Sequence, residues 1–129
     1  MAGTTNTSRT LAYLKTLGWE AGVVERYLSF AGEYGQRKDL FGVIDIIAIT
    51  DKSIAGIQSC GSSFAEHNKK ILSEPLSLKW IEKGGILMLI GWRKVVKKRG
   101  SKVKIWSPRI KEYTVNDFKE DTNEEEVLV

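Results

Sequence analysis

Cysteine and histidine, which form disulfides or bind structural metals in small proteins, are almost absent from this chain. Its 129 residues include one cysteine, Cys60, and one histidine, His67. No intrachain disulfide can form, and we expect no structural zinc site, because such a site takes four nitrogen or sulfur ligands. A chain of this length can bury a hydrophobic core without disulfides or a structural metal, so the length predicts one domain. The lone thiol favours a cytoplasmic protein, or a viral protein acting in the host cytoplasm.

Long hydrophobic runs are lacking as well. The longest, residues 42–49 and 84–92, are shorter than the roughly 20 apolar residues that cross a bilayer. The opening residues, MAGTTNTSRT, do not contain the apolar core of a signal peptide. We therefore expect no membrane partner.

Basic charge is plentiful and unevenly placed. The net charge is +4, but residues 1–115 carry 19 basic against 10 acidic side chains, whereas residues 116–129 carry six acidic and one basic. We expect a basic domain over residues 1–115 and an acidic, flexible tail over residues 116–129. A basic body is typical of a protein that binds a polyanion, and a charged surface that only keeps the chain dissolved is the alternative.

Hydrophobic periodicity and turn residues predict one α/β domain, a mixed sheet flanked by helices in the order α-β-β-β-α-α-β-β. Thr7 or Ser8 is expected to cap the first helix, and Pro108 places the last strand at a sheet edge. Residues 31–41 are expected to form a loop. Helices are expected over residues 8–17, 64–72 and 76–83. Strands are expected in the first half of residues 19–30, where helix is the alternative, and over residues 42–50, 54–60, 86–92 and 103–113.

Asp45 is the most informative single residue, because it interrupts the apolar run GVIDIIAIT. A buried carboxylate needs a cation, a hydrogen-bond partner or exposure at a sheet edge. Strand alternation is expected to place Val43, Asp45 and Ile47 on one face, with Ile44 and Ile46 on the other. Asp45 is therefore either a metal ligand at the sheet surface or the partner of a lysine or arginine.

A second polar position follows on the next strand. Gln58 lies in IAGIQSC, and its amide oxygen can ligate a hard cation, although more weakly than a carboxylate does. Side chains on paired neighbouring strands can face each other, so Gln58 can meet Asp45. The carbonyl of Ser59 is a third candidate oxygen, and Asp39 and Glu25 are close enough in sequence to join the set.

These segments resemble the PD-(D/E)XK nuclease superfamily. The resemblance rests on GVIDIIAI, a turn and IAGIQSC, on the approach RKDLFGVIDIIAI, and on LMLIGWRKV as the fourth core strand. It covers roughly residues 8–110, and the helix-strand-strand-strand-helix-strand order is that of the superfamily core. Small phage-type and resolvase-like nucleases, including the VRR-NUC group, are the most similar. The resemblance implies a restriction-endonuclease-like core, Mg²⁺ or Mn²⁺ as cofactor, branched or phage DNA as substrate, and a homodimer.

Position by position, Asp45 matches the metal-binding Asp of the motif. Gln58 takes the place of the usual Asp/Glu, and Cys60 that of the usual Lys, which orients or activates the attacking water and neutralises the phosphate. A thiol cannot do this. The resemblance therefore implies that a lysine from elsewhere substitutes, and the candidates are Lys38 before the motif and Lys69 or Lys70 on the following helix.

A run of bases follows the strand 86–92, with no acid among them and Gly100 at the expected hairpin tip. Such a hairpin can follow a phosphate backbone, and the flanking Trp92 and Trp106 can stack on unpaired bases, although Trp92 is also expected in the core. The run consists of Arg93, Lys94, Lys97, Lys98, Arg99, Lys102 and Lys104, and Arg37, Lys38 and Arg109 are candidates to extend it.

The sequence thus predicts a metal-dependent endonuclease acting on DNA. A catalytically degenerate nucleic-acid-binding protein on the same scaffold is the alternative, and Cys60 is its best support. A third hypothesis is an interaction subunit whose basic face meets an acidic protein.

Overall fold

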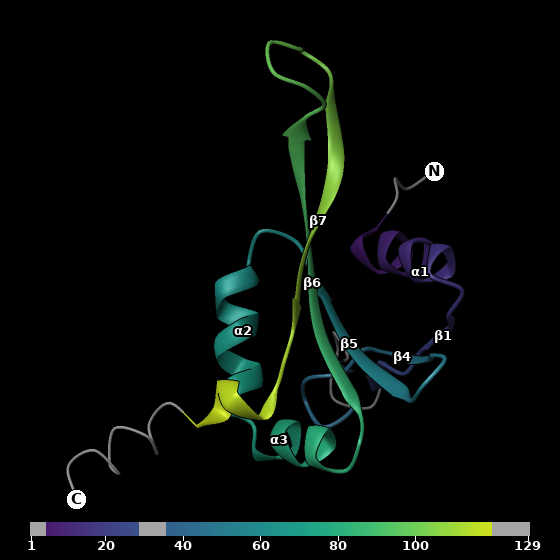
Figure 1. The fold of residues 1–129 in the computed structure, drawn as a ribbon, viewed down its shortest axis with the longest axis vertical. Coiled ribbons are helices and arrows are strands. Elements are labelled where there is room, and N and C mark those ends of the chain that lie inside the picture. Colours follow the sequence, from purple (N-terminus) through teal and green to yellow (C-terminus); the bar gives the residue numbers. More distant parts are fainter. Residues whose placement is uncertain (1–4, 29–35, 120–129) are drawn as a thin grey trace, which may run out of the picture.

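A computed structural model of the chain describes residues 5–28 and 36–119. It is a single α/β domain with a five-stranded mixed sheet, a separate two-stranded ribbon and three α-helices (Figure 1). The helices are α1 (Asn6–Thr16), α2 (Phe64–Ser73) and α3 (Pro75–Glu82). The strands are β1 (Glu20–Val23), β2 (Arg26–Leu28), β3 (Gln36–Lys38), β4 (Ile46–Ile49), β5 (Ile54–Cys60), β6 (Ile86–Val96) and β7 (Lys104–Glu112).

The helices form where periodicity predicted them, and their caps explain the boundaries. Thr5, rather than the predicted Thr7 or Ser8, caps α1, and its side chain forms a reciprocal capping box with Ser8. Pro75 lies in the first turn of α3, where its missing N–H costs nothing, and the Glu74 carboxylate accepts the N–H of Leu76. The helices are therefore closed by local hydrogen bonds as well as by packing.

Two strand predictions were wrong. Part of the segment 31–41, predicted to be a loop, forms β3, which pairs antiparallel with β2. β4 begins only at Ile46, because Leu40 and Ile44 pair across a tight turn and interrupt the strand before it. The predicted alternation holds for Val43, Ile47 and Ile46 but was wrong for Ile44, which packs on the same face as Val43 for the same reason.

The sheet order is β1-β4-β5-β6-β7, with β5 and β6 parallel and all other neighbours antiparallel. β7 lies at the edge, as Pro108 predicted. One core cluster lies on the α1 face and includes Leu14, Ile57 and Ile90, all fully buried. The other lies on the face covered by α2 and α3 and includes Ile71 and Leu89. The domain therefore has three layers, with helices on both faces of the sheet.

A long hairpin leaves the sheet between α1 and α2. β5 ends at Cys60, opposite Gly91, whereas β6 continues to Val96 and pairs from there on with β7 alone. We call residues 92–108, which reach beyond β5, the arm (Figure 1). Gly100 at its tip has φ of +83°, a left-handed conformation that glycine adopts without strain.

Residues Val115–Phe118, most of which the sequence assigned to the tail, form a 3₁₀ turn, η2. Phe118 packs against the α2/α3-side core, and Asp117 pairs with Lys111 at 3.4 Å. The rest of the predicted tail, residues 120–129, lies outside the described residues. No helix in the described part of the chain is long and apolar enough to span a bilayer.

Candidate functional site

A tight turn brings two carboxylates together. The Leu40 N–H donates to the Ile44 carbonyl at 2.7 Å, and the Ile44 N–H donates to the Leu40 carbonyl at 3.0 Å. Asp39 and Asp45, which flank this pair in the sequence, are thereby brought next to each other. Phe41 has φ of +57° and Gly42 +77°, which makes the reversal possible. Asp45 then enters the sheet, where its N–H donates to the Ile57 carbonyl at 3.0 Å.

The Asp45 side chain is buried and held by β5. Its residue exposure is 6%, and the Ser59 N–H donates to both carboxylate oxygens, at 3.2 and 3.3 Å. The Gln58 amide nitrogen donates to Oδ2 at 3.1 Å. Within the described part of the chain, no lysine or arginine forms an ion pair with Asp45. Two neutral donors therefore hold this carboxylate in the place of a cation.

The surroundings of Asp45 disfavour its charge. Its pKa is raised from 3.8 to about 7, mainly because burial penalises the charged form. The negative charge of Asp39 adds to this rise and that of Glu25 adds less, whereas the hydrogen bond from Ser59 opposes it. A cation bound beside Asp45 would reverse this rise in pKa, because it would favour the charged carboxylate.

Gln58 carries a second sign of an incomplete site. Its side-chain oxygen Oε1 is buried and accepts no hydrogen bond from the residues that the structure describes. An orphaned acceptor beside a carboxylate fits a hard cation, because Mg²⁺ is commonly held by one or two carboxylates and completes its shell with water and substrate phosphate. In the described residues no three His, Cys, Asp or Glu side chains converge into a metal group. The site thus offers one carboxylate and one amide oxygen, with Asp39 and Glu25 as electrostatic neighbours.

Lys70 of α2 forms an ion pair with Asp39 at the edge of this cluster. Its Nζ lies 3.9 Å from Asp39 Oδ2. Burial raises the pKa of the Cys60 thiol, and the charge of Lys70 opposes part of that rise. Lys69, the helix lysine expected in the site, is exposed on α2, and within the described residues no ion pair joins it to this cluster. Lys38 is exposed in β3.

Cys60 stands where the motif lysine was expected. It is buried, at 4% exposure, and burial raises the pKa of its thiol, with the nearby charge of Asp45 as the second cause. A thiol in such surroundings stays protonated, so Cys60 is neither a nucleophile nor a cation. It fills space in the α2-side core.

A polar network that the sequence did not reveal runs behind Asp45 toward α1. The Ser59 hydroxyl donates to the Asn6 carbonyl at 3.1 Å. The Thr10 hydroxyl is therefore the donor in its 2.7 Å hydrogen bond to the Ser59 oxygen. Thr10 in turn accepts the indole N–H of Trp92 at 2.8 Å. The only sign of this network in the sequence is that Thr10 and Ser59 are polar residues at buried positions. The network holds the backbone of Ser59, whose N–H binds the Asp45 carboxylate.

The predicted cations lie along the arm, from its base to its tip. All seven bases of the run are exposed, from Arg93 to Lys104, and Arg109 stacks its guanidinium 4.1 Å from the centre of the Phe64 ring. The side chain of Arg37 lies outside the described residues. β5 ends at Cys60, two residues after Gln58, and the first of these cations, Arg93, follows two residues after Gly91, the partner of Cys60 on β6.

Removing charge from the tip of the arm gives a first prediction. Changing Lys97, Lys98 and Arg99 together to serine should lower the steepness of log affinity against log salt by roughly 2 to 3 units, because each phosphate contact contributes about 0.9. Electrophoretic or anisotropy titrations of duplex DNA measure it. The matched control removes Lys52, Lys79 and Lys83 at the opposite end of the molecule, and should leave the slope unchanged. Equal slopes for both variants would mean that the arm does not touch phosphate.

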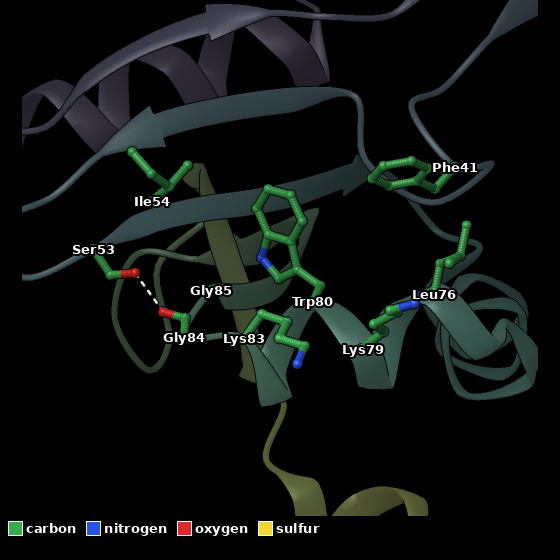
Figure 2. A pocket seen from close by; sticks show the side chains of 9 residues that line it. All are labelled: Phe41, Ser53, Ile54, Leu76, Lys79, Trp80, Lys83, Gly84 and Gly85. Carbon is green, nitrogen blue, oxygen red and sulfur yellow. Dashed lines mark hydrogen bonds between the residues drawn. The ribbon is translucent and has the colours of Figure 1, made fainter.

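A separate apolar hollow of about 430 Å³ lies beside α3. Figure 2 shows Trp80 at its centre, with Phe41, Ile54 and Leu76 around it and Lys79 and Lys83 nearby. The Trp80 indole N–H is satisfied by the Ile86 carbonyl at 2.8 Å. None of the predicted site residues lines this hollow, so it is not part of the candidate site.

The candidate site is thus a buried carboxylate, an orphaned amide oxygen, a helix lysine and a basic arm on one small sheet. Comparison of the chain with models of protein families, with curated proteins and with solved structures finds no significant match. The chemistry of the site itself therefore carries the functional assignment.

Proposed function

We propose that this chain is a metal-dependent nuclease that hydrolyses phosphodiester bonds of DNA. The observation that carries the proposal is the buried Asp45 carboxylate, which has no cationic partner among the described residues, next to Gln58, whose Oε1 accepts no hydrogen bond from them. Buried charge without a counter-charge costs stability, so a chain that keeps it has a use for it. The exposed cations of the arm suit a polyanionic substrate.

The order of elements supports the same proposal. Leaving out the β2–β3 ribbon, the chain runs α1, β1, β4, β5, α2 and later β6, the helix-strand-strand-strand-helix-strand order of the PD-(D/E)XK core. In that frame Asp45 stands at the start of the second strand and Gln58 on the third. A restriction-endonuclease-like core, a homodimer and a cytoplasmic place of action belong to this proposal.

Each residue has a distinct task in the proposed reaction. Asp45 and Gln58 would hold Mg²⁺ or Mn²⁺, which when bound polarises the phosphate and makes water more acidic. Lys70 sets its ammonium beside the acidic cluster, where it neutralises charge on the phosphate in the place of the motif lysine. The Ser59 N–H keeps the Asp45 carboxylate oriented, and the arm holds the backbone. Water adds to phosphorus, the bond to one bridging oxygen breaks, and the proton that the water loses is balanced by a proton taken up by the leaving oxygen.

Cleavage assays test the proposal. Labelled duplex, flap, four-way junction and single-stranded DNA are incubated with magnesium, with manganese or with EDTA. We expect cleavage of at least one substrate in either metal and none in EDTA. Cleavage that persists in EDTA would contradict the metal site, and an absence of cleavage in every metal would remove the nuclease.

One observation favours a second function. Cys60 is a buried, protonated thiol at the place of the motif lysine. Binding of DNA without cleavage in any metal would therefore identify a degenerate scaffold that holds nucleic acid.

A further inference from the structure

A groove lies between α1 and the base of the arm, on the face of the sheet opposite Cys60 and α2. Its volume is about 790 Å³, within the roughly 300–1,000 Å³ typical of ligand sites. Arg9 and Tyr13 of α1 line one wall, and Trp92, Lys94 and Trp106 of the arm line the other. Among the described residues, no acidic side chain lines it. The groove thus combines three aromatic rings with two cations.

Trp106 is built into this groove as an accessible platform. The Arg9 guanidinium lies 3.6 Å from the centre of its ring, and the Lys94 ammonium lies 5.3 Å away. A hydrogen bond of 3.0 Å to the Asn6 side chain orients Arg9. Trp106 nevertheless stays 42% exposed. Arg9 therefore covers part of the ring at stacking distance and Lys94 lies farther off, while the rest of the ring surface is open to a base.

Two of the aromatic rings in the walls are held by contacts within the domain. Trp92 is buried and its indole N–H is fixed by Thr10, while Tyr13 packs edge-to-face against it with ring centres 6.4 Å apart. Trp106 and Lys94 are directly paired across the arm, so both side chains lie on the same face. A flat ligand therefore meets a preformed site.

We propose that this groove binds an unpaired nucleotide, with the base stacked on Trp106 and its phosphate beside Arg9 and Lys94. The inference rests on the proposed function, since it adds a base-binding subsite to the nucleic-acid face of the nuclease. Aromatic platforms beside cations are how proteins hold single strands, because every base presents a flat π surface, whereas bases paired inside a duplex are not accessible. A substrate with a single-stranded segment is therefore preferred over a continuous duplex.

Binding in EDTA separates this subsite from catalysis. A labelled oligothymidylate and a blunt duplex are titrated with the wild-type chain, Trp106→Ala, Trp106→Phe and Ile105→Ala. Ile105 is the matched control, because it is also 42% exposed but points to the opposite face of the arm. We expect Trp106→Ala to weaken oligothymidylate binding about 10-fold and duplex binding less than about 2-fold. Trp106→Phe should keep most of the affinity, and thermal unfolding checks that each variant is folded.

Several results would overturn the subsite. One is a Trp106→Ala variant that behaves like Ile105→Ala; another is an equal loss for duplex and single strand. Displacement of the oligothymidylate by polyglutamate at equal charge would mean that the groove takes acidic protein instead. Metal-dependent cleavage without a Trp106 effect removes only the subsite, whereas selective single-strand binding without cleavage removes only the nuclease.

Discussion

Asp45→Asn should abolish metal-dependent cleavage and at the same time stabilise the folded chain at pH 8 by about 2 to 4 kcal/mol. Cleavage is lost because the amide has no negative charge with which to hold a divalent cation. Stability rises because the buried charge disappears, while the Asn oxygen still accepts the Ser59 N–H. Once the Gln58 amide turns over, so that Oε1 takes the place of Nε2, the Asn amide can also donate to Oε1. Opposite changes in activity and stability are the signature of a charge kept for function.

The free energy of unfolding should also depend on pH because of the buried Asp45 carboxyl. Between pH 3.8 and about 7 the folded chain holds a proton on Asp45 that the unfolded chain has released. The free energy of unfolding of the wild type therefore falls as the pH rises through this window, by up to about 4 kcal/mol for a shift of about three units. Above pH 7 the whole cost is present. The difference between Asp45→Asn and wild type should therefore be largest there and shrink toward pH 4.

Urea unfolding at a series of pH values measures this difference. Asp51→Asn, in the exposed turn between β4 and β5, is the control and should leave the stability curve within about 0.5 kcal/mol of the wild type. An Asp45→Asn variant that is less stable than the wild type at pH 8 would mean that a counter-charge pairs with the carboxylate.

Lys70→Gln should reduce cleavage about 100- to 1,000-fold, the usual loss when one preorganised donor to a developing charge is removed. Lys70 Nζ lies 3.9 Å from Asp39 and its side chain is 45% exposed, so the ion pair itself contributes little to stability. The loss should therefore appear in cleavage rate and not in the unfolding curve.

Lys69→Gln is the matched control for this variant. It removes the same charge from the next residue of α2, so it changes the net charge and the DNA attraction equally. Single-turnover cleavage of both variants at saturating DNA gives the comparison. Equal rates for the two variants would show that no helix lysine takes the place of the motif lysine at Cys60.

The choice between these two lysines shows what the sequence could and could not predict. Phe64 and Ile71 lie seven residues apart and mark the buried stripe of α2. At about 100° per residue, Lys69 lies about 160° from Ile71 and Lys70 about 100° from it, so Lys70 is the one at the edge of the packed face. The stripe was present in the sequence, but only the position of α2 over the sheet shows that this edge meets Asp39.

Elements with strong periodicity or clear turn residues were predictable, and local reversals were not. The apolar run of β6 and the Pro75 start of α3 specified those elements. The β2–β3 ribbon was missed because its strands are only three residues long and carry no apolar alternation. The turn at Leu40–Ile44 was missed because Phe41 takes a left-handed conformation that its residue type does not suggest.

The candidate site divides in the same way. The apolar run around Asp45 predicted a buried carboxylate, and its proximity to Gln58 followed from the hairpin of β4 and β5. The links to Thr10 and Trp92 depend on how α1 crosses the sheet, which no local pattern specifies. The groove at Trp106 depends on the same crossing, because Arg9 and Lys94 are 85 positions apart in the chain.

Titration of the Asp45 carboxyl carbon by NMR, with and without Mg²⁺, tests the central claim most directly, and the difference from Asp45→Asn assigns the signal. We predict a pKa of about 7 in the metal-free chain and a clearly lower pKa in magnesium, because a bound cation favours the charged form. A pKa that magnesium does not change would contradict the account, because Asp45 would then be a buried structural carboxylate and not a ligand.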